Sequence, residues 1–76
     1  MNKHEAKVKI GNYILSLCAV PMADSRWRGI YEVKATLLSG ITIKGPIEME
    51  ETFPRAQEAI AAAHEAARKA VVRLPR

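Results

Sequence analysis

The chain has 76 residues, a formal net charge of +4 and a single cysteine. A chain of this length forms one domain and buries only about 60% of the surface that its unfolded form exposes, so its margin of stability is small. One cysteine excludes an intramolecular disulfide and favours a reducing compartment, which leaves association with another chain as the expected source of extra stability.

The first predicted strand spans residues 8–20 and follows a polar segment, residues 1–7, which we expect to be a disordered tail. Residues 13–20 (YILSLCAV) are apolar at every position except Ser16, and turn-forming residues bound them, which is typical of a strand. Gly11-Asn12 interrupts the segment. It can close a two-residue hairpin, but we expect a bulge in one long strand because the part before it is short.

The second predicted strand, residues 27–38, has the clearest alternation in the chain. Its predicted inner face consists of Trp27, Tyr31, Val33, Ala35 and Leu37. The opposite face is polar except for Ile30 and Leu38. Ser39-Gly40 is typical of a hairpin connection, and a third strand then begins at Ile41 and can extend to Met49.

The last predicted element is a helix within residues 52–74 that starts between residues 53 and 55. Steps of three and four place its buriable residues on one face: Phe53, Ala56, Ile60, Ala63, Ala67, Ala70 and Leu74. Because most of them are alanines, this helix can approach its neighbour closely but buries little area.

The predicted order is therefore β-β-β-α in a single α+β domain over residues 1–76. Short connections favour a three-stranded antiparallel meander with the C-terminal helix packed on one face. We expect Trp27 to be buried between the sheet and the helix, so that Trp27→Ala costs about 3–5 kcal/mol.

Three features resemble a loose group of small uncharacterised bacterial β-β-β-α proteins: a tyrosine-led apolar strand, Trp27-Arg28 at the start of the second strand, and an alanine-rich final helix. The resemblance covers most of the chain and implies this fold without any known activity. Residues 41–71 are also similar to the last strand and helix of a double-stranded RNA-binding domain. That family has lysines at the start of this helix for phosphate contact, whereas Glu50 and Glu51 precede a lone Arg55 here, and the family's first helix is missing.

We expect no catalytic, cofactor-binding or metal site. Cys18 lies inside an apolar strand with no histidine or lysine near it in sequence, which favours a structural cysteine over a nucleophile. His64 is followed by Glu65 on the predicted helix, but no nucleophile is spaced to join it, so a solvated or interface histidine is favoured. The remaining histidine, His4, comes from a separate segment, and metal ligands must lie close together.

The basic residues indicate a possible nucleic-acid site. Arg28, Lys34 and Lys44 share the outer face of the predicted sheet, and Arg26 in the adjoining loop can extend them into a patch for phosphates. Glu32 interrupts this row, so a solvated charged face is the favoured interpretation. A nucleic-acid-binding module remains the alternative function.

The favoured function is a non-enzymatic structural or protein-interaction module in the cytoplasm, with no membrane contact, because no apolar run approaches the roughly 20 residues of a membrane span. A homodimer is expected because one helix covers one sheet face, whereas the first strand is apolar on both. The predicted interface consists of Ile14, Ser16, Cys18, Val20, Ile30 and Leu38. Edge pairing and face stacking both remain open as its geometry, and the N-terminal segment folding back over the strand is the alternative to a dimer.

Overall fold

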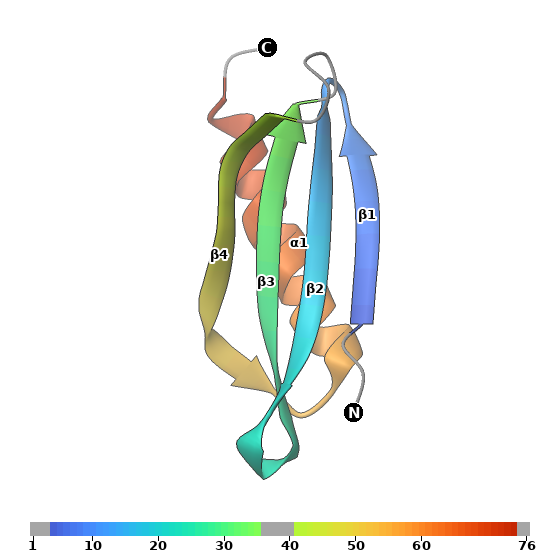
Figure 1. Ribbon diagram of the computed structural model, residues 1–76, viewed down its shortest axis with the longest axis vertical. Helices are drawn as coiled ribbons and strands as arrows, with labels where there is room; N and C mark the ends of the chain where they lie inside the picture. The colour runs from blue at the N-terminus through green and yellow to red at the C-terminus, as the bar shows by residue number, and fades with distance from the viewer. Residues whose placement is uncertain (1–3, 36–40, 75–76) are drawn as a thin grey trace.

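A computed structural model describes residues 4–35 and 41–74, and within them it shows a four-stranded antiparallel sheet with one α-helix across one face (Figure 1). The elements are β1 (His4–Ile10), β2 (Tyr13–Met22), β3 (Arg26–Ala35), β4 (Ile41–Phe53) and α1 (Ala56–Val72). The strands lie in sequence order across the sheet. The α+β class, the meander and the C-terminal helix are confirmed, but the predicted number of strands is wrong.

The additional strand exists because Gly11-Asn12 closes a hairpin and does not form the predicted bulge. β1 pairs with β2 without a register shift, from Ile10 opposite Tyr13 to His4 opposite Ala19. Gly11 has a φ of +57°, and glycine tolerates this angle at no steric cost in a two-residue hairpin turn. The polar segment before the turn therefore becomes an edge strand.

The predicted disordered tail is wrong for residues 4–7, which belong to β1, whereas residues 1–3 lie outside the described part of the chain. Ala6, Val8 and Ile10 are partly buried against the core, and the residues between them are exposed. This alternation is weak in the sequence because alanine is a poor hydrophobic signal. The predicted Ser39-Gly40 turn and the inner-face residue Leu37 also lie outside the described residues.

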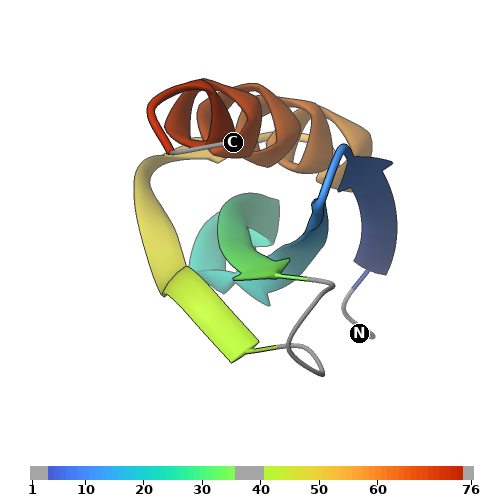
Figure 2. The ribbon, with the colours of Figure 1, turned by 90° about the horizontal axis from the view of Figure 1, so that it is seen from above.

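The core lies between the inner face of the sheet and α1. The predicted inner face of the second strand is confirmed by Tyr31 and Val33, which are buried, and by Gly29 between Trp27 and Tyr31. On β2 the buried residues are Leu15, Leu17 and Ala19. Figure 2 shows the sheet curving around the helix, so that β2 and β3 lie beneath it and β1 and β4 lie at either side.

α1 places its smallest side chains against the sheet. Its buried residues are Ala56, Ala59, Ala63, Ala67 and Val71. Ile60 and Ala70, predicted on this face, are only half-buried, because the helix is turned slightly toward its alanines. The turn permits a close approach to β3, where a Cβ added to Gly29 would lie 2.6 Å from the carbonyl oxygen of Ala59.

The helix begins at Ala56, one residue after the predicted range. Arg55 precedes it in an extended conformation, with φ −130° and ψ 144°. Proline disfavours helical angles in the residue before it, so Pro54 keeps Phe53 extended, and Phe53 pairs with Trp27 as the last residue of β4. Within residues 4–35 and 41–74, no helix has the length and apolarity that a membrane crossing needs.

Trp27 is half-buried, so the prediction that it is buried between sheet and helix is wrong in degree. It packs against Ala19, Ala56 and Ala59, and its ring lies edge-on to the ring of His4, with a centroid distance of 5.1 Å and an interplanar angle of 80°. Trp27 sits at the end of the sheet where the helix has only begun, and the helix residues there are alanines. The indole therefore keeps part of its surface in water.

Trp27→Ala is expected to lower the free energy of unfolding by about 2 kcal/mol, less than the 3–5 kcal/mol that full burial implies, because part of the indole is already solvated. Urea unfolding followed by circular dichroism measures this loss. Leu15→Ala is the matched reference, since Leu15 is fully buried. An equal or larger loss for Trp27→Ala would show that the indole is a main support of the core.

Candidate functional site

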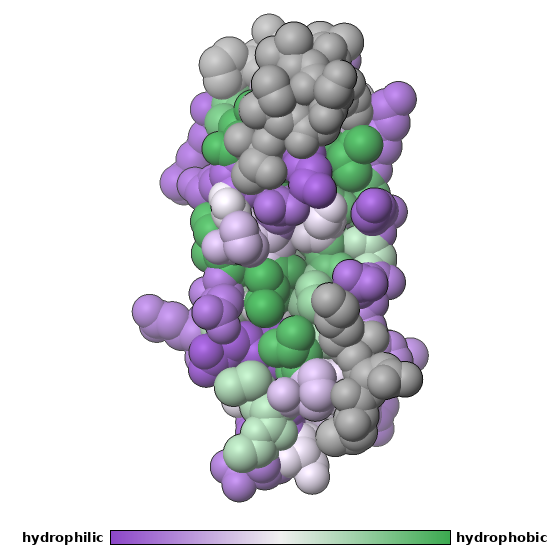
Figure 3. Space-filling model, in the orientation of Figure 1, coloured by the Kyte–Doolittle hydropathy of each residue, from purple (hydrophilic) through white to green (hydrophobic). Residues whose placement is uncertain are grey.

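The outer face of the sheet, on the side away from α1, is the candidate functional surface. It faces the viewer in Figures 1 and 3, with the helix behind it. Figure 3 shows apolar side chains gathered along the middle of this face and hydrophilic side chains toward its margins. A sheet face that meets water alone is usually polar, so an apolar middle is a feature that needs an explanation.

The predicted interface residues occupy the middle of this face. Ile14, Ser16, Cys18 and Val20 alternate along β2 with the buried residues of the inner face, because successive side chains of a strand point to opposite sides. Ile30 on β3 lies directly opposite Cys18 in the register. All five are half-buried, and the sixth predicted residue, Leu38, lies outside the described residues.

A shallow hollow of about 280 Å³ lies at the centre of the outer face. Its lining residues are Glu5, Ser16, Leu17, Cys18, Ile30, Tyr31, Glu32 and Pro46. β4 contributes Pro46 where its register with β3 shifts between Tyr31 and Val33. The lining thus combines the outer-face residues Cys18 and Ile30 with the two carboxylates of Glu5 and Glu32.

The strand register arranges the outer-face charges in rows that cross the sheet. Arg28 lies opposite Val20 at one end of β2, and three further rows follow toward the other end. The basic row consists of Lys9, Ile14 and Lys34. The middle row consists of Lys7, Ser16 and Glu32. The acidic row consists of Glu5, Cys18, Ile30 and Glu48. The basic row and the acidic row thus each combine apolar residues from the central strands with charges of one sign.

The predicted basic patch is divided among local partners. Arg28 Nη1 lies 3.8 Å from Glu48 Oε1, and Lys34 Nζ lies 3.4 Å from Glu32 Oε1. Arg26 donates hydrogen bonds to Thr52, at 2.7 Å to its Oγ1 and 2.6 Å to its carbonyl oxygen.

Lys44, the fourth residue of the predicted patch, is exposed on β4. Such exposed ion pairs contribute little stability, but neighbouring carboxylates reduce the positive potential that phosphates need. The outer face is therefore mixed in charge, and nucleic-acid binding stays a prediction.

The candidate reactive residues are not brought together. Cys18 lies half-buried in the hollow of the outer face, whereas His64 lies half-buried on α1, on the opposite side of the sheet. His4 packs against Trp27 at the start of β1. In the part of the chain that the structure describes, no three histidine, cysteine, aspartate or glutamate side chains are grouped to hold a metal ion.

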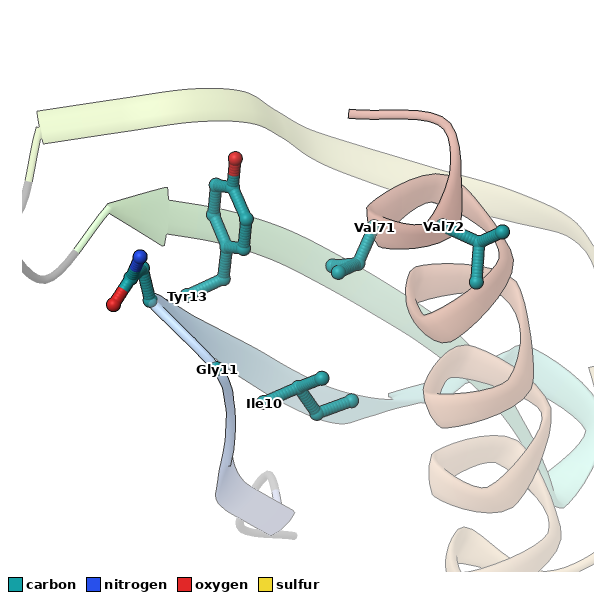
Figure 4. A pocket seen from close by; sticks show the side chains of 6 residues that line it. Ile10, Gly11, Tyr13, Val71 and Val72 are labelled. Carbon is teal, nitrogen blue, oxygen red and sulfur yellow. The ribbon is translucent and has the colours of Figure 1, made fainter. Parts of the chain in front are cut away.

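A second pocket, which the sequence did not predict, lies between the β1–β2 turn and the C-terminal end of α1 (Figure 4). Its volume is about 360 Å³, and its lining residues are Ile10, Gly11, Asn12, Tyr13, Val71 and Val72. Val71 points toward Ile10 and Tyr13, whereas Val72 points away from them and is 76% exposed. The β1–β2 turn forms one wall of this pocket. The pocket therefore could not be predicted from a sequence interpretation that placed a bulge at Gly11-Asn12.

No family model, curated protein or solved structure matches the chain. The resemblance to small bacterial β-β-β-α proteins stays a prediction.

Proposed function

We propose that this protein is a small structural or interaction module that acts as a homodimer through the outer face of its sheet, with no catalytic role. The observation that supports it is the apolar middle of that face, where Ile14, Cys18, Val20 and Ile30 remain only half-buried on the two central strands. Removing apolar surface from water is favourable by about 25 cal/mol per Å², and this gain opposes the entropy that two chains lose on association. Association gives this face the cover that a single helix cannot provide.

The charge distribution favours a second copy of the chain as the partner. The outer face carries both an acidic row and a basic row, so it is complementary to itself, as a two-fold interface requires. The outer face is also large enough for a stable interface. The protein measures 40 × 21 × 15 Å along its principal axes, and a standard interface takes about 800 Å² from each partner, which a face bounded by the two longer dimensions can supply.

Ile14→Lys is expected to convert the dimer to a monomer, because it places a charge in the apolar middle of the interface without touching the core. Sedimentation equilibrium at tens of micromolar should give twice the 8.4 kDa chain mass for the wild type and the single mass for the variant. Circular dichroism checks that the variant keeps its fold.

Val72→Lys is the matched control, because Val72 is the most exposed large apolar side chain among the described residues and lies on α1, away from the outer face. It should leave the mass of the dimer unchanged. A wild type that stays monomeric and folded at high concentration would refute the proposal. A monomer that binds short RNA or DNA with an affinity that falls steeply as salt rises would favour the nucleic-acid alternative instead.

A further inference from the structure

We infer that the two-fold axis of the homodimer crosses the strands at the middle row, so that the basic row of each copy faces the acidic row of its partner. This inference rests on the proposed function, and it specifies which residues meet. The axis then passes near Ser16, which lies between Ile14 of the basic row and Cys18 of the acidic row on β2.

The charges of the two rows favour this arrangement. An axis across the strands places β1 over the partner's β1 and reverses its direction, so Lys9 faces the partner's Glu5, and Glu5 faces the partner's Lys9. Lys34 likewise comes over the partner's Ile30, next to the partner's Glu48. The same contacts occur twice, once on each side of the axis, because a two-fold interface is isologous.

The shapes of the two rows agree with the charges. The hollow extends over the acidic and middle rows, because Glu5, Cys18 and Ile30 of the acidic row and Ser16 and Glu32 of the middle row line it. In this arrangement Ile14 of each copy lies over the partner's Cys18 and can enter that hollow, whose volume of about 280 Å³ is sufficient for an isoleucine side chain. Apolar side chains of each copy would then fill the apolar depression of the other, with the lysines beside the carboxylates.

Other two-fold arrangements are less favourable. An axis parallel to the strands preserves the row and places β1 over the partner's β4, so Glu5 meets the partner's Glu48 and the like charges repel. Pairing of β1 with the partner's β1 at the sheet edge leaves Ile14 and Cys18 on an uncovered face, because edge pairing extends the sheet sideways and covers neither face.

Face stacking about an axis across the strands also brings Lys7 over the partner's Lys7 and Glu32 over the partner's Glu32. Each of these like-charge contacts occurs once, on the axis, and Glu32 lies 3.4 Å from Lys34 of its own chain, whereas the contacts between the basic and acidic rows occur twice. This arrangement therefore covers the apolar middle and pairs the opposite charges of those two rows.

Paired charge reversals test the axis. Glu5→Lys places a lysine opposite the partner's Lys9, and Lys9→Glu places a glutamate opposite the partner's Glu5, so each variant alone should dimerise about tenfold more weakly than the wild type. An equimolar mixture of the two variants pairs every lysine with a glutamate. Sedimentation of this mixture should give a heterodimer with a Kd within about threefold of the wild-type value.

Glu58→Lys and Lys69→Glu are the matched controls, since they make the same charge changes at exposed positions of α1. Each should change the dimer Kd by less than about twofold. A wild-type dimer whose two variants are not weakened, or whose mixture is not restored, overturns the axis but leaves the homodimer. A wild type that is monomeric refutes the proposed function itself, and the axis with it.

Cysteine cross-linking separates this axis from edge pairing. The variant Ile14→Cys/Cys18→Ser, mixed with the wild type, should form a hetero-cross-link with a short bismaleimide, because the two cysteines face each other across the interface. Either protein alone should cross-link much less, since its two cysteines are offset by four residues, about 13 Å along the strand. Efficient Cys18 cross-linking in the wild type alone, or none in the mixture, would overturn the axis.

Discussion

Leu15→Ala is expected to lower the free energy of unfolding by about 3–5 kcal/mol, enough to unfold much of the protein at room temperature. Leu15 has no exposed surface and is, with Val33, one of the largest fully buried side chains among the described residues. It packs in a core whose helix side is made mostly of alanines, which cannot move in to fill the space that truncation leaves. Urea unfolding followed by circular dichroism measures the loss.

Ile14→Ala is the matched control, because Ile14 is the neighbouring residue on the same strand and points to the outer face. In the monomer it should cost less than about 1 kcal/mol, since a half-buried side chain loses little burial. In the dimer its cost should depend on protein concentration, because association is linked to folding. A larger loss for Ile14→Ala than for Leu15→Ala at high dilution would show that the two faces of the sheet have been assigned the wrong way round.

Gly29→Ala is expected to lower the free energy of unfolding by about 2 kcal/mol, and Gly29→Val by more, although alanine and valine are better strand formers than glycine. A Cβ at Gly29 would lie 2.6 Å from the carbonyl oxygen of Ala59 and 3.2 Å from the Cβ of Ala63. The first contact is with the helix backbone, so relieving it requires a shift of α1 as a whole. Thermal unfolding by circular dichroism measures the change.

Ala63→Gly should not rescue Gly29→Ala, because the closest contact is with a backbone oxygen that this second change leaves in place. Ala35→Val, at a half-buried position of the same strand and face, serves as the control and should cost less than about 1 kcal/mol. A stabilising effect of Gly29→Ala would mean that α1 does not approach β3 as closely as its alanines allow.

The β1–β2 hairpin is the feature for which the local sequence pattern predicted a different structure from the one observed. The sequence of residues 4–10 carries only Ala6, Val8 and Ile10 as inward residues, and the first of them contributes little hydrophobic signal. Whether Gly11-Asn12 forms a turn or a bulge depends on whether the segment before it gains a partner strand. The partner is β2, and the pairing is favourable because those three residues also reach the edge of the core.

The sequence by itself determined which side chains of the central strands share a face, where the helix lies, and that the outer face carries Ile14, Cys18, Val20 and Ile30. These follow from periods of two and about four residues, which are properties of the local backbone. The register between strands, the rotation of the helix toward its alanines and the partial exposure of Trp27 were decided only in the tertiary structure. These three features depend on how closely elements that are distant in sequence can approach each other. The distance between α1 and β3 is set by small residues at their contact, such as Gly29 and Ala59.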